Sequence, residues 1–283
     1  MAVIDIIDIT DPADERVDDF RDLNSVDRRP DLPTGKGLVI AEGVLVVQRM
    51  LASRFVPHAF LGTPRRLAEL GPHLGAGAPF FRASAEVMAE VVGFHLNRGV
   101  LAAARRPPEL TVADVLAGSR TVAVLEGVND HENIGSIFRN AAGLGVDAMI
   151  FGAGCADPLY RRAVRVSMGH ALLLPYARMA RWPQDLQVLR AAGFRLLAMT
   201  PDPQAEVLAE ALGGLAGERV AVLVGAEGPG LTDAALRTAD ARVRIPMSRD
   251  TDSLNVATAA GLAFYERVRC GERRGTEVQT SRG

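Results

Sequence analysis

Five polar side chains that could form a binding or catalytic site follow apolar stretches of this chain. They are Asn133, Arg139, Glu227, Ser253 and Asn255. An arginine can hold a phosphate group through two parallel hydrogen bonds, and a glutamate set among glycines can accept hydrogen bonds from hydroxyl or amine donors. An unpaired buried amide costs about 1–3 kcal/mol. We therefore expect Asn255, at the start of an apolar stretch, to bond either to backbone or to a ligand.

Each of these residues also has a purely structural interpretation when it is taken alone. Ser253 is a candidate N-cap for an Ala- and Gly-rich helix from Leu254 to Val268, which is apolar on nearly every face and so is expected to be buried. Arg139 would lie on the polar side of a helix that begins at Asn133, where an arginine is usually a solvated charge. Glu227 could equally be a turn residue. The functional interpretation depends on where the surrounding elements place these side chains.

The surrounding elements predict an α/β domain with a mostly parallel sheet. The runs expected as strands are TVAVLEGV (121–128), AMIFG (148–152), ALLLPYA (171–177), FRLLAMT (194–200), RVAVLVGAE (219–227) and ARVRIPM (241–247). Continuous β-branched runs, rather than strict alternation, favour a parallel sheet covered on both faces. In such a sheet ligands bind outside the carboxyl ends of the strands. The polar side chains follow strands, so they are expected at this edge.

A smaller α/β domain is expected ahead of this sheet, because strand-like and helix-like segments also alternate from Lys36 to Arg106. The Pro107-Pro108 pair then ends the regular pattern. The predicted divisions are a peripheral N-terminal arm (1–35), the smaller domain (36–106), a linker (107–119), the larger domain (120–271) and a flexible polar tail (272–283).

The composition is that of an ordinary globular chain, with 48% hydrophobic and 23% charged residues and a net charge of −2. That charge does not mark a nucleic-acid binder, although arginine carries almost all the positive charge because Lys36 is the only lysine. No signal peptide or membrane span is recognised, so a cytoplasmic location is expected. Cys155 and Cys270 lack metal-ligand spacing and are expected to be inert thiols, and no metal site is predicted.

Two nucleotide-binding signatures are absent from the glycine-rich loop Gly225 to Gly230. It lacks the GK[ST] ending of a P-loop and does not match GxGxxG. No glycine-rich turn follows the strand that ends near Val128 either. A doubly wound nucleotide-binding enzyme is therefore disfavoured.

Taken together, NIGSIFRNA, LVGAEGPGL and IPMSRDTDSLNVATAA resemble, in order and spacing, the three motifs of the SPOUT-class RNA methyltransferases, in the SpoU/TrmH branch. The match covers roughly residues 121–269. The resemblance implies a mostly parallel α/β sheet with a C-terminal trefoil knot, here formed by residues 220–260, which is an exception to the unknotted rule. The segment 36–106 looks like the RNA substrate-recognition domain, of ribosomal-protein-like α/β fold, that is often fused ahead of it.

The resemblance further implies that S-adenosylmethionine donates a methyl group to a ribose 2′-hydroxyl of RNA. Ribosomal RNA is favoured over tRNA because of the fused N-terminal domain, and a homodimer is expected. An arginine stays protonated, so we expect Arg139 to orient the phosphate and stabilise the oxyanion. Asn133, Glu227, Ser253 and Asn255 would orient Arg139, the ribose and the cofactor. The residues expected against the cofactor are Thr200, Gly225, Ile245, Met247 and Leu254.

The cluster Arg161, Arg162 and Arg165 is expected on a helix after the second strand of the larger domain. It is either a solvated helix face or part of an RNA track, since phosphate contacts supply most nonspecific affinity. Arg105 and Arg106 are weaker candidates for the same role. A noncatalytic RNA-binding or ribosome-assembly protein on the same fold is the main alternative, and it would be favoured if a motif residue were missing.

Overall fold

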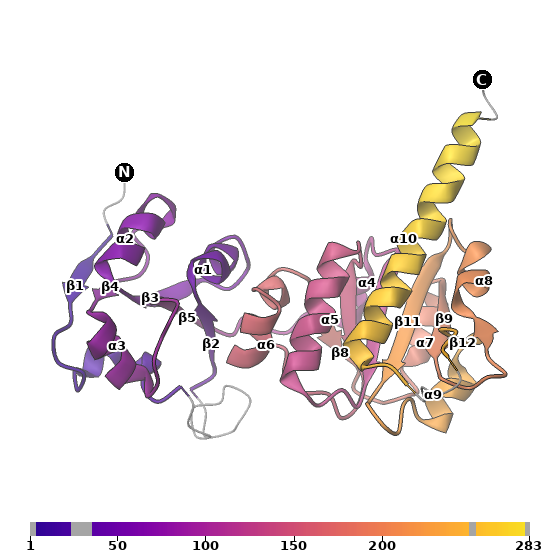
Figure 1. Cartoon of the computed structure of the whole chain (residues 1–283), viewed down its shortest axis with the longest axis horizontal. Coiled ribbons are helices and arrows are strands. Elements are labelled where there is room, and N and C mark those ends of the chain that lie inside the picture. Colours follow the sequence, from indigo (N-terminus) through magenta and orange to yellow (C-terminus); the bar gives the residue numbers. More distant parts are fainter. Residues whose placement is uncertain (1–3, 24–35, 249–252, 281–283) are drawn as a thin grey trace. The chain divides into compact units, whose positions relative to one another are not determined.

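The computed structural model describes residues 4–23, 36–248 and 253–280 of the chain (Figure 1). The chain forms two compact units, of which unit 1 comprises Met1–Pro108 and Asp157–Leu173 and unit 2 comprises Glu109–Ala156 and Leu174–Gly283. Each unit has its own sheet and its own hydrophobic core, so the two are described separately.

Unit 1 is built on a five-stranded mixed sheet. Its strands are β1 (Ile6–Asp8), β2 (Leu38–Glu42), β3 (Pro57–Gly62), β4 (Phe80–Arg82) and β5 (Val100–Arg105). Its helices are η1 (Glu15–Phe20), α1 (Val44–Leu51), α2 (Pro64–Leu70), η3 (Gly71–His73), α3 (Ala85–Val92), α6 (Arg161–Val166) and η4 (His170–Leu172). The spatial order is β1-β4-β3-β5-β2, with β5 antiparallel to both of its neighbours. The strand and helix alternation predicted for 36–106 is confirmed.

The prediction of a peripheral N-terminal arm is wrong for the described part of that segment. β1 pairs in parallel with β4, with Ile6 opposite Phe80. Val17 and Phe20 of η1 are fully buried in the core of unit 1. The acidic residues around these apolar ones hid the pattern, because a three-residue strand and a six-residue 3-10 helix are too short to show a period. Residues 24–35 of the predicted arm lie outside the described residues.

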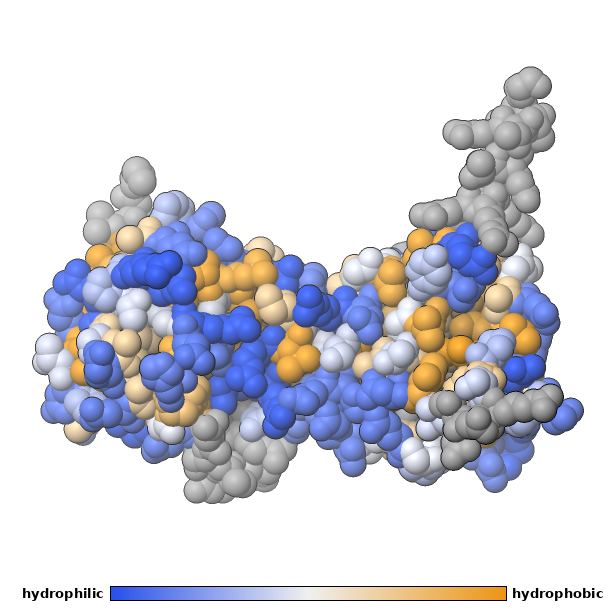
Figure 2. Space-filling view, viewed as in Figure 1, coloured by the Kyte–Doolittle hydropathy of each residue, from blue (hydrophilic) through white to orange (hydrophobic). Residues whose placement is uncertain are grey.

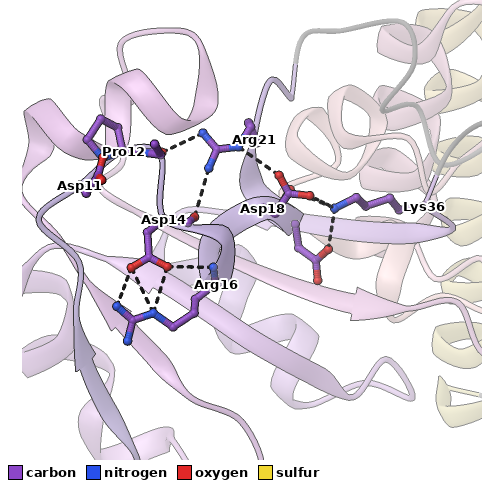
Figure 3. A network of polar contacts seen from close by, with 9 residues as sticks. Asp11, Pro12, Asp14, Arg16, Asp18, Arg21 and Lys36 are labelled. Carbon is purple, nitrogen blue, oxygen red and sulfur yellow. Dashed lines mark hydrogen bonds and ion pairs between the residues drawn. The ribbon is translucent and has the colours of Figure 1, made fainter.

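Several acidic side chains of this segment are paired with basic groups of the same unit, as Figure 3 shows for Asp14 and Asp18. The Arg21 guanidinium donates to the Pro12 carbonyl at 2.7 Å and to the Asp18 carboxylate at 3.0 Å. Lys36 Nζ lies 2.7 Å from Asp18 Oδ2 and 3.1 Å from Asp19 Oδ1. Partly exposed pairs of this kind contribute about 0–1 kcal/mol each. The burial of Phe20 is therefore the main force that holds the segment in place.

Unit 1 also includes α6, which the sequence analysis placed in the larger domain. Arg161 Nη1 donates to Glu42 Oε2 at 2.8 Å, and the two side chains are only 14% and 6% exposed. The Arg106 guanidinium pairs with the buried carboxylate of Asp157. Removing one partner of a buried pair costs about 3–5 kcal/mol. These pairs fix the segment Asp157–Leu173 to unit 1.

Unit 2 is built on a seven-stranded sheet in which every pairing is parallel, as predicted. Its strands are β6 (Thr121–Glu126), β7 (Ala148–Phe151), β8 (Tyr176–Arg178), β9 (Phe194–Met199), β10 (Glu206–Val207), β11 (Arg219–Gly225) and β12 (Ala241–Arg244). Its helices are α4 (Val112–Leu116), α5 (His131–Gly143), α7 (Leu186–Ala191), α8 (Leu208–Gly213), α9 (Asp233–Thr238) and α10 (Val256–Thr280). The spatial order is β10-β12-β9-β11-β6-β7-β8.

Helices cover both faces of this sheet, which explains why its strands read as continuous apolar runs. On one face α10 packs against β11, α5 and α8, and on the other α4 packs on β7 and β8 and α7 on β9 (Figure 1). All six residues of β6 are buried. Val122 and Val124 contribute to the core beneath α4 and α7, so the alternate residues of the strand face the other layer.

Four boundaries in unit 2 differ from the sequence prediction. The predicted linker contains α4, whose Val115 and Leu116 are buried in the core of unit 2. The run predicted as a strand over 171–177 contributes only Tyr176 and Ala177 to β8, because η4 occupies its first part. β12 ends at Arg244 rather than Met247. The predicted flexible tail lies largely within α10, which continues to Thr280 because no proline interrupts it.

The helix α10 is also less buried than its composition suggested. Val256, Ala260 and Phe264 lie in the interior, whereas Leu262 is 40% and Tyr265 52% exposed. This spacing leaves one apolar strip of the helix facing outward. Figure 2 shows hydrophobic surface on the side of unit 2 that carries α10. Among the described residues, no helix combines the length and the apolar character needed to span a membrane.

We predict that Phe20→Ala lowers the free energy of unfolding of unit 1 by about 3–5 kcal/mol, because it empties a fully buried aromatic site. Urea denaturation followed by circular dichroism measures this change. Val56→Ala is the control, since Val56 is 77% exposed and its truncation should change stability by less than about 0.5 kcal/mol. Equal stabilities for the two variants would show that the N-terminal segment is not part of the core.

Candidate active site

A pocket lies in unit 2 at the carboxyl ends of β9, β11 and β12. Its cavity volume is about 140 Å³, and it opens to solvent. All five residues that the sequence analysis expected at the cofactor line it, namely Thr200, Gly225, Ile245, Met247 and Leu254. Apolar side chains and glycine backbone dominate the lining, which is typical of a site for a small organic molecule. The parallel sheet places the pocket at the edge where such folds bind ligands.

The loop after β11 can approach the pocket closely only because it is rich in glycine. A Cβ atom on Gly225 would lie 2.1 Å from the carbonyl carbon of Gly230, so no other residue fits there without moving the loop. The Gly230 amide donates to the Ala226 carbonyl at 3.0 Å and closes the loop on itself. Gly228 has a φ of +85°, which an L side chain rarely adopts. The loop is therefore a tight turn whose backbone faces the pocket.

Three of the predicted polar residues meet beside this pocket. Asn255 Nδ2 donates to Glu227 Oε1 at 2.7 Å and lies 2.9 Å from Asn133 Oδ1. Asn133 Nδ2 donates to the same Glu227 oxygen at 3.1 Å. These residues come from α5, from the loop after β11 and from the start of α10. Asn133 and Glu227 are 94 residues apart in the sequence. The three motifs therefore converge on one hydrogen-bonded group.

Asn255, rather than Ser253, caps α10. Asn255 Oδ1 accepts from the amides of Ala257 at 3.0 Å and Thr258 at 3.2 Å. The prediction that Ser253 is the N-cap is wrong, because the helix begins only at Val256. Ser253 is instead an exposed residue that lines the pocket. Asn255 is exposed, rather than buried as the sequence analysis assumed, but its amide does bond to backbone, which is one of the two expected partners.

Arg139 lies on the exposed side of α5, and no hydrogen bond or ion pair involves it among the described residues. The opposite side of the helix is buried through Ile134, Ile137 and Phe138, which confirms the predicted period. The helix starts at His131 rather than at Asn133, because the Asp130 side chain accepts from the amides of the first turn at 2.7 and 2.9 Å. The Arg139 guanidinium can therefore meet a ligand without first breaking a contact described here.

Sequence reasoning did not single out Asn140, the neighbour of Arg139. Its Nδ2 donates to the Ala257 carbonyl in the first turn of α10 at 2.9 Å. A Cβ atom on Gly261 would lie 3.0 Å from the same nitrogen, so the glycine lets the two helices approach. Asn140 thus ties the arginine-bearing helix to the helix that Asn255 caps. The Gly in an otherwise Ala-rich helix was the sequence signal for this close packing.

The arginines proposed for RNA binding fall into two groups. Arg161 and Arg106 pair with Glu42 and Asp157 inside unit 1, which gives them a structural role, and their contact with RNA stays a prediction. Burial lowers the pKa of the Arg161 guanidinium, against the opposing effect of the Glu42 carboxylate. The remaining candidates are Arg105 and Arg162, which are exposed, and Arg165, which is 39% exposed and 4.0 Å from Glu42.

Cys155 lies beyond the carboxyl end of β7 in unit 2. Its Sγ is 3.3 Å from the Leu125 carbonyl oxygen. Burial raises the pKa of the Cys155 thiol above its usual value, while the amides of Val128 and Gly127 act in the opposite direction. No group of three or more His, Cys, Asp or Glu side chains suited to a metal ion occurs among the residues described.

Comparisons with known proteins agree with the positions of these motifs. The model of the SpoU rRNA Methylase family matches residues 120–265. A tRNA/rRNA methyltransferase of Mycobacterium tuberculosis, described as uncharacterized, is 75% identical over 269 residues, which cover 95% of this chain and 93% of that protein. The 23S rRNA (guanosine-2′-O-)-methyltransferase RlmB of Vibrio parahaemolyticus is 29% identical over 178 residues, covering 61% of this chain and 70% of RlmB.

A solved structure extends the comparison to the whole fold. The AdoMet-bound rRNA methyltransferase of Sinorhizobium meliloti superposes with a TM-score of 0.77 at 23% identity, covering 93% of this chain and 98% of that one. At this level of identity the likeness concerns the fold, and it confirms the predicted α/β architecture.

We predict that Asn255→Ala lowers the free energy of unfolding of unit 2 by about 1 kcal/mol, because the first amides of α10 lose their cap. Ser253→Ala is the matched control and should stay within about 0.5 kcal/mol of the parent chain. Thermal and urea unfolding measure both. A larger loss for Ser253→Ala than for Asn255→Ala would contradict the assignment of the cap.

We predict that Cys155 reacts with iodoacetamide more slowly than a free cysteine at pH 8. Burial raises the pKa of the Cys155 thiol, so less of the reactive thiolate is present below that pKa. The rate is measured by mass spectrometry in a Cys270→Ser background and should continue to rise as the pH passes 9. A rate equal to that of free cysteine at pH 8 would refute the proposed burial effect.

Proposed function

Since this chain belongs to the SpoU rRNA methylase family, we propose that it methylates a ribose 2′-hydroxyl of ribosomal RNA. The chain is an RNA methyltransferase, and S-adenosylmethionine is its cofactor. The observation that carries the finer assignment is the hydrogen-bonded group of Asn133, Glu227 and Asn255 beside the pocket. The similarity to RlmB, which is named a 23S rRNA (guanosine-2′-O-)-methyltransferase, supports the choice of the ribose hydroxyl as acceptor and of ribosomal RNA as substrate.

The pocket residues suit this cofactor. S-adenosylmethionine supplies an electrophilic methyl group on a cationic sulfur, attached to an adenosine and to an amino acid. Ile245, Met247 and Leu254 offer apolar contact to the faces of the adenine ring and to the methylene groups. The backbone of the glycine loop offers amide and carbonyl groups for the polar edges. The Glu227 carboxylate adds negative charge at the side of the pocket where a cation would be stabilised.

Arg139 is proposed to hold the phosphate next to the target ribose. A guanidinium stays protonated and cannot act as a base, but its paired donors match a phosphate and can stabilise the charge that develops on the ribose oxygen. Asn133 and Asn255 fix one oxygen of Glu227, and the other, which has no partner among the described residues, can accept a hydrogen bond from a ribose hydroxyl. The methyl group would bond to the ribose oxygen as its bond to sulfur breaks, and the hydroxyl proton would pass to the Glu227 carboxylate or to water, so that alignment and proton removal together lower the barrier.

The site residues belong to a region that we propose to be knotted. Residues 220–260 would form the trefoil knot that the resemblance implies. The close contact of Gly225 with Gly230 and the convergence of β9, β11 and β12 segments on one pocket support this proposal. An experimental structure would contradict this proposal if its chain path contained no knot, that is, if drawing the two ends apart gave a straight line.

The proposed RNA substrate has consequences for the role of unit 1 and for the place where the chain acts. Unit 1 is proposed to recognise RNA, with Arg105, Arg162 and Arg165 as candidate phosphate contacts, because arginine recognises phosphate without reading sequence. The chain is proposed to act in the cytoplasm, where bacterial RNA is modified, and to need no metal ion. If Arg105→Ala weakens the binding of all RNA sequences equally, the result supports RNA recognition by unit 1. Unchanged RNA binding would show that Arg105 is not part of the RNA-binding surface.

We predict that the chain methylates ribosomal RNA taken from a strain that lacks it, and that Arg139→Ala loses at least about 100-fold in rate, as when a positioned charge is removed from a transition state. Labelled S-adenosylmethionine is incubated with ribosomal RNA and with total tRNA, and the ribose of the product is analysed. Arg139→Lys should also be impaired, because an ammonium cannot reproduce the two parallel hydrogen bonds. Arg237→Ala is the surface control, because Arg237 is exposed on α9.

Incorporation of labelled methyl groups into tRNA alone would show that tRNA, rather than ribosomal RNA, is the substrate class. Full activity of Arg139→Lys would contradict the proposal that Arg139 holds the phosphate through two hydrogen bonds. Binding of S-adenosylmethionine without transfer to either naked RNA would favour a substrate that exists only in an assembling ribonucleoprotein. A chain that binds RNA without the cofactor would support the noncatalytic alternative.

We predict a homodimer formed through the outward strip of α10, which exposes Leu262 and Tyr265. Light scattering should give about twice the chain mass of 30.1 kDa. Leu262→Glu should shift the protein toward the monomer, since a charge would be buried at the contact. Val188→Glu is the control, because Val188 is 44% exposed on α7. A monomeric parent chain, or equal effects of both variants, would contradict this interface.

A further inference from the structure

Glu126 is a buried carboxylate that the proposed function does not use. It is the last residue of β6 and is only 5% exposed. Its two oxygens accept hydrogen bonds from three donors. Oε2 accepts from the Thr232 amide at 2.8 Å, and Oε1 accepts from the Thr232 hydroxyl at 2.9 Å and from the Trp182 indole. A carboxylate with this many donors is satisfied away from water.

These contacts place Glu126 at both ends of the loop that lines the cofactor pocket. At the start of the loop, Gly225 is the parallel partner of Glu126 in the register of β11 and β6. At its end, Thr232 caps α9 and is held by the Glu126 side chain. Between these points the loop contributes Gly225, Glu227 and Gly230 to the pocket. A single residue therefore joins the entry and the exit of the loop.

The neighbouring residues leave this arrangement little freedom to shift. A Cβ atom on Gly127 would lie 3.1 Å from the Ala226 side chain, so the chain after Glu126 packs directly against the loop. On the other side, the Trp182 ring lies so close to Gly152 that a Cβ atom there would be 2.5 Å away. The indole that donates to Glu126 is thus fixed by packing.

We propose that Glu126 is a positioning residue for the cofactor, which fixes the loop from Gly225 to Gly230 in its binding conformation through Thr232. This inference rests on the assignment of the pocket to S-adenosylmethionine. Glu126 itself does not line the pocket. Its effect reaches the cofactor through the loop, and it also sets the position of Glu227 and so of the hydrogen-bonded group with Asn133 and Asn255.

The direct test compares Glu126→Gln with Glu42→Gln in the full chain. The glutamine keeps the shape of Glu126 but replaces one acceptor oxygen with a donor, so one buried N–H or O–H group loses its partner. Calorimetry should show that Glu126→Gln binds S-adenosylmethionine about tenfold more weakly. Glu42 is the matched control, because it is an equally buried carboxylate at a strand end of unit 1, and its variant should keep the parent affinity within about twofold.

Hydrogen exchange without any cofactor tests the loop independently of the proposed function. In Glu126→Gln the amides of Thr232 and Gly230 should exchange faster than in the parent chain, because a donor of Thr232 or Trp182 loses its acceptor and the Gly230 amide closes the loop that Thr232 holds. Trp182 is the only tryptophan in the chain, so its emission should also shift. A residue that served stability alone would lower the melting temperature without changing the affinity of the folded protein or the exchange of these two amides.

Two further variants keep the test informative if Glu126→Gln does not fold. Thr232→Ser keeps the hydroxyl and should bind the cofactor like the parent chain, whereas Thr232→Val removes it and should bind more weakly. Parent affinity and parent exchange in Glu126→Gln would overturn the proposal, as would equal affinities of the two Thr232 variants. If the parent chain does not bind S-adenosylmethionine, the pocket assignment fails, and the exchange of Thr232 and Gly230 alone decides whether Glu126 positions the loop.

Discussion

The amide of Asn255 links the parts of this molecule that its chemistry needs. Its oxygen accepts from the first amides of α10, while its nitrogen donates to Glu227 and lies against Asn133. The start of a helix, a glycine loop and the first turn of α5 are thereby held by one side chain. Since the orphan amides of a helix need a partner, the position of α10 and the geometry of the polar group are set together.

The parallel sheet explains why these segments can meet. Its strands are buried on both faces, so chemical variation is confined to the loops at their carboxyl ends. The pocket takes its lining from such loops, and Glu126 and Gly225 bring the ends of two neighbouring strands to the same level. Unit 1 is interleaved with this domain along the chain, because Asp157–Leu173 leaves unit 2 after β7 and returns before β8. Truncation at Pro108 would therefore deprive Arg161 of its partner Glu42.

The sequence was sufficient for the parallel α/β domain and for the polar residues at the strand ends, because apolar runs and glycine loops have local signatures. The five pocket residues followed instead from the resemblance of the three motifs to the SpoU/TrmH branch. It was misleading where a residue's role depends on a distant partner. Arg161 resembled a solvated helix charge, yet Glu42 buries it. Ser253 had the right chemistry for a cap, but the helix starts three residues later. The residues next to Asn140 and Glu126 gave no signal of their roles, since their partners lie on other elements, and only Gly261 on the facing helix marked the packing of Asn140.

The central claim is that the ends of β9, β11 and β12 form the cofactor site of unit 2. Hydrogen exchange of the full chain with and without S-adenosylmethionine tests it most directly, with NAD and ATP as control ligands. The cofactor, and neither control, should slow exchange at residues 199–201, 224–230 and 253–256, where the pocket is lined, and should leave unit 1 unchanged. Protection confined to unit 1, or equal protection by NAD or ATP, would contradict the account.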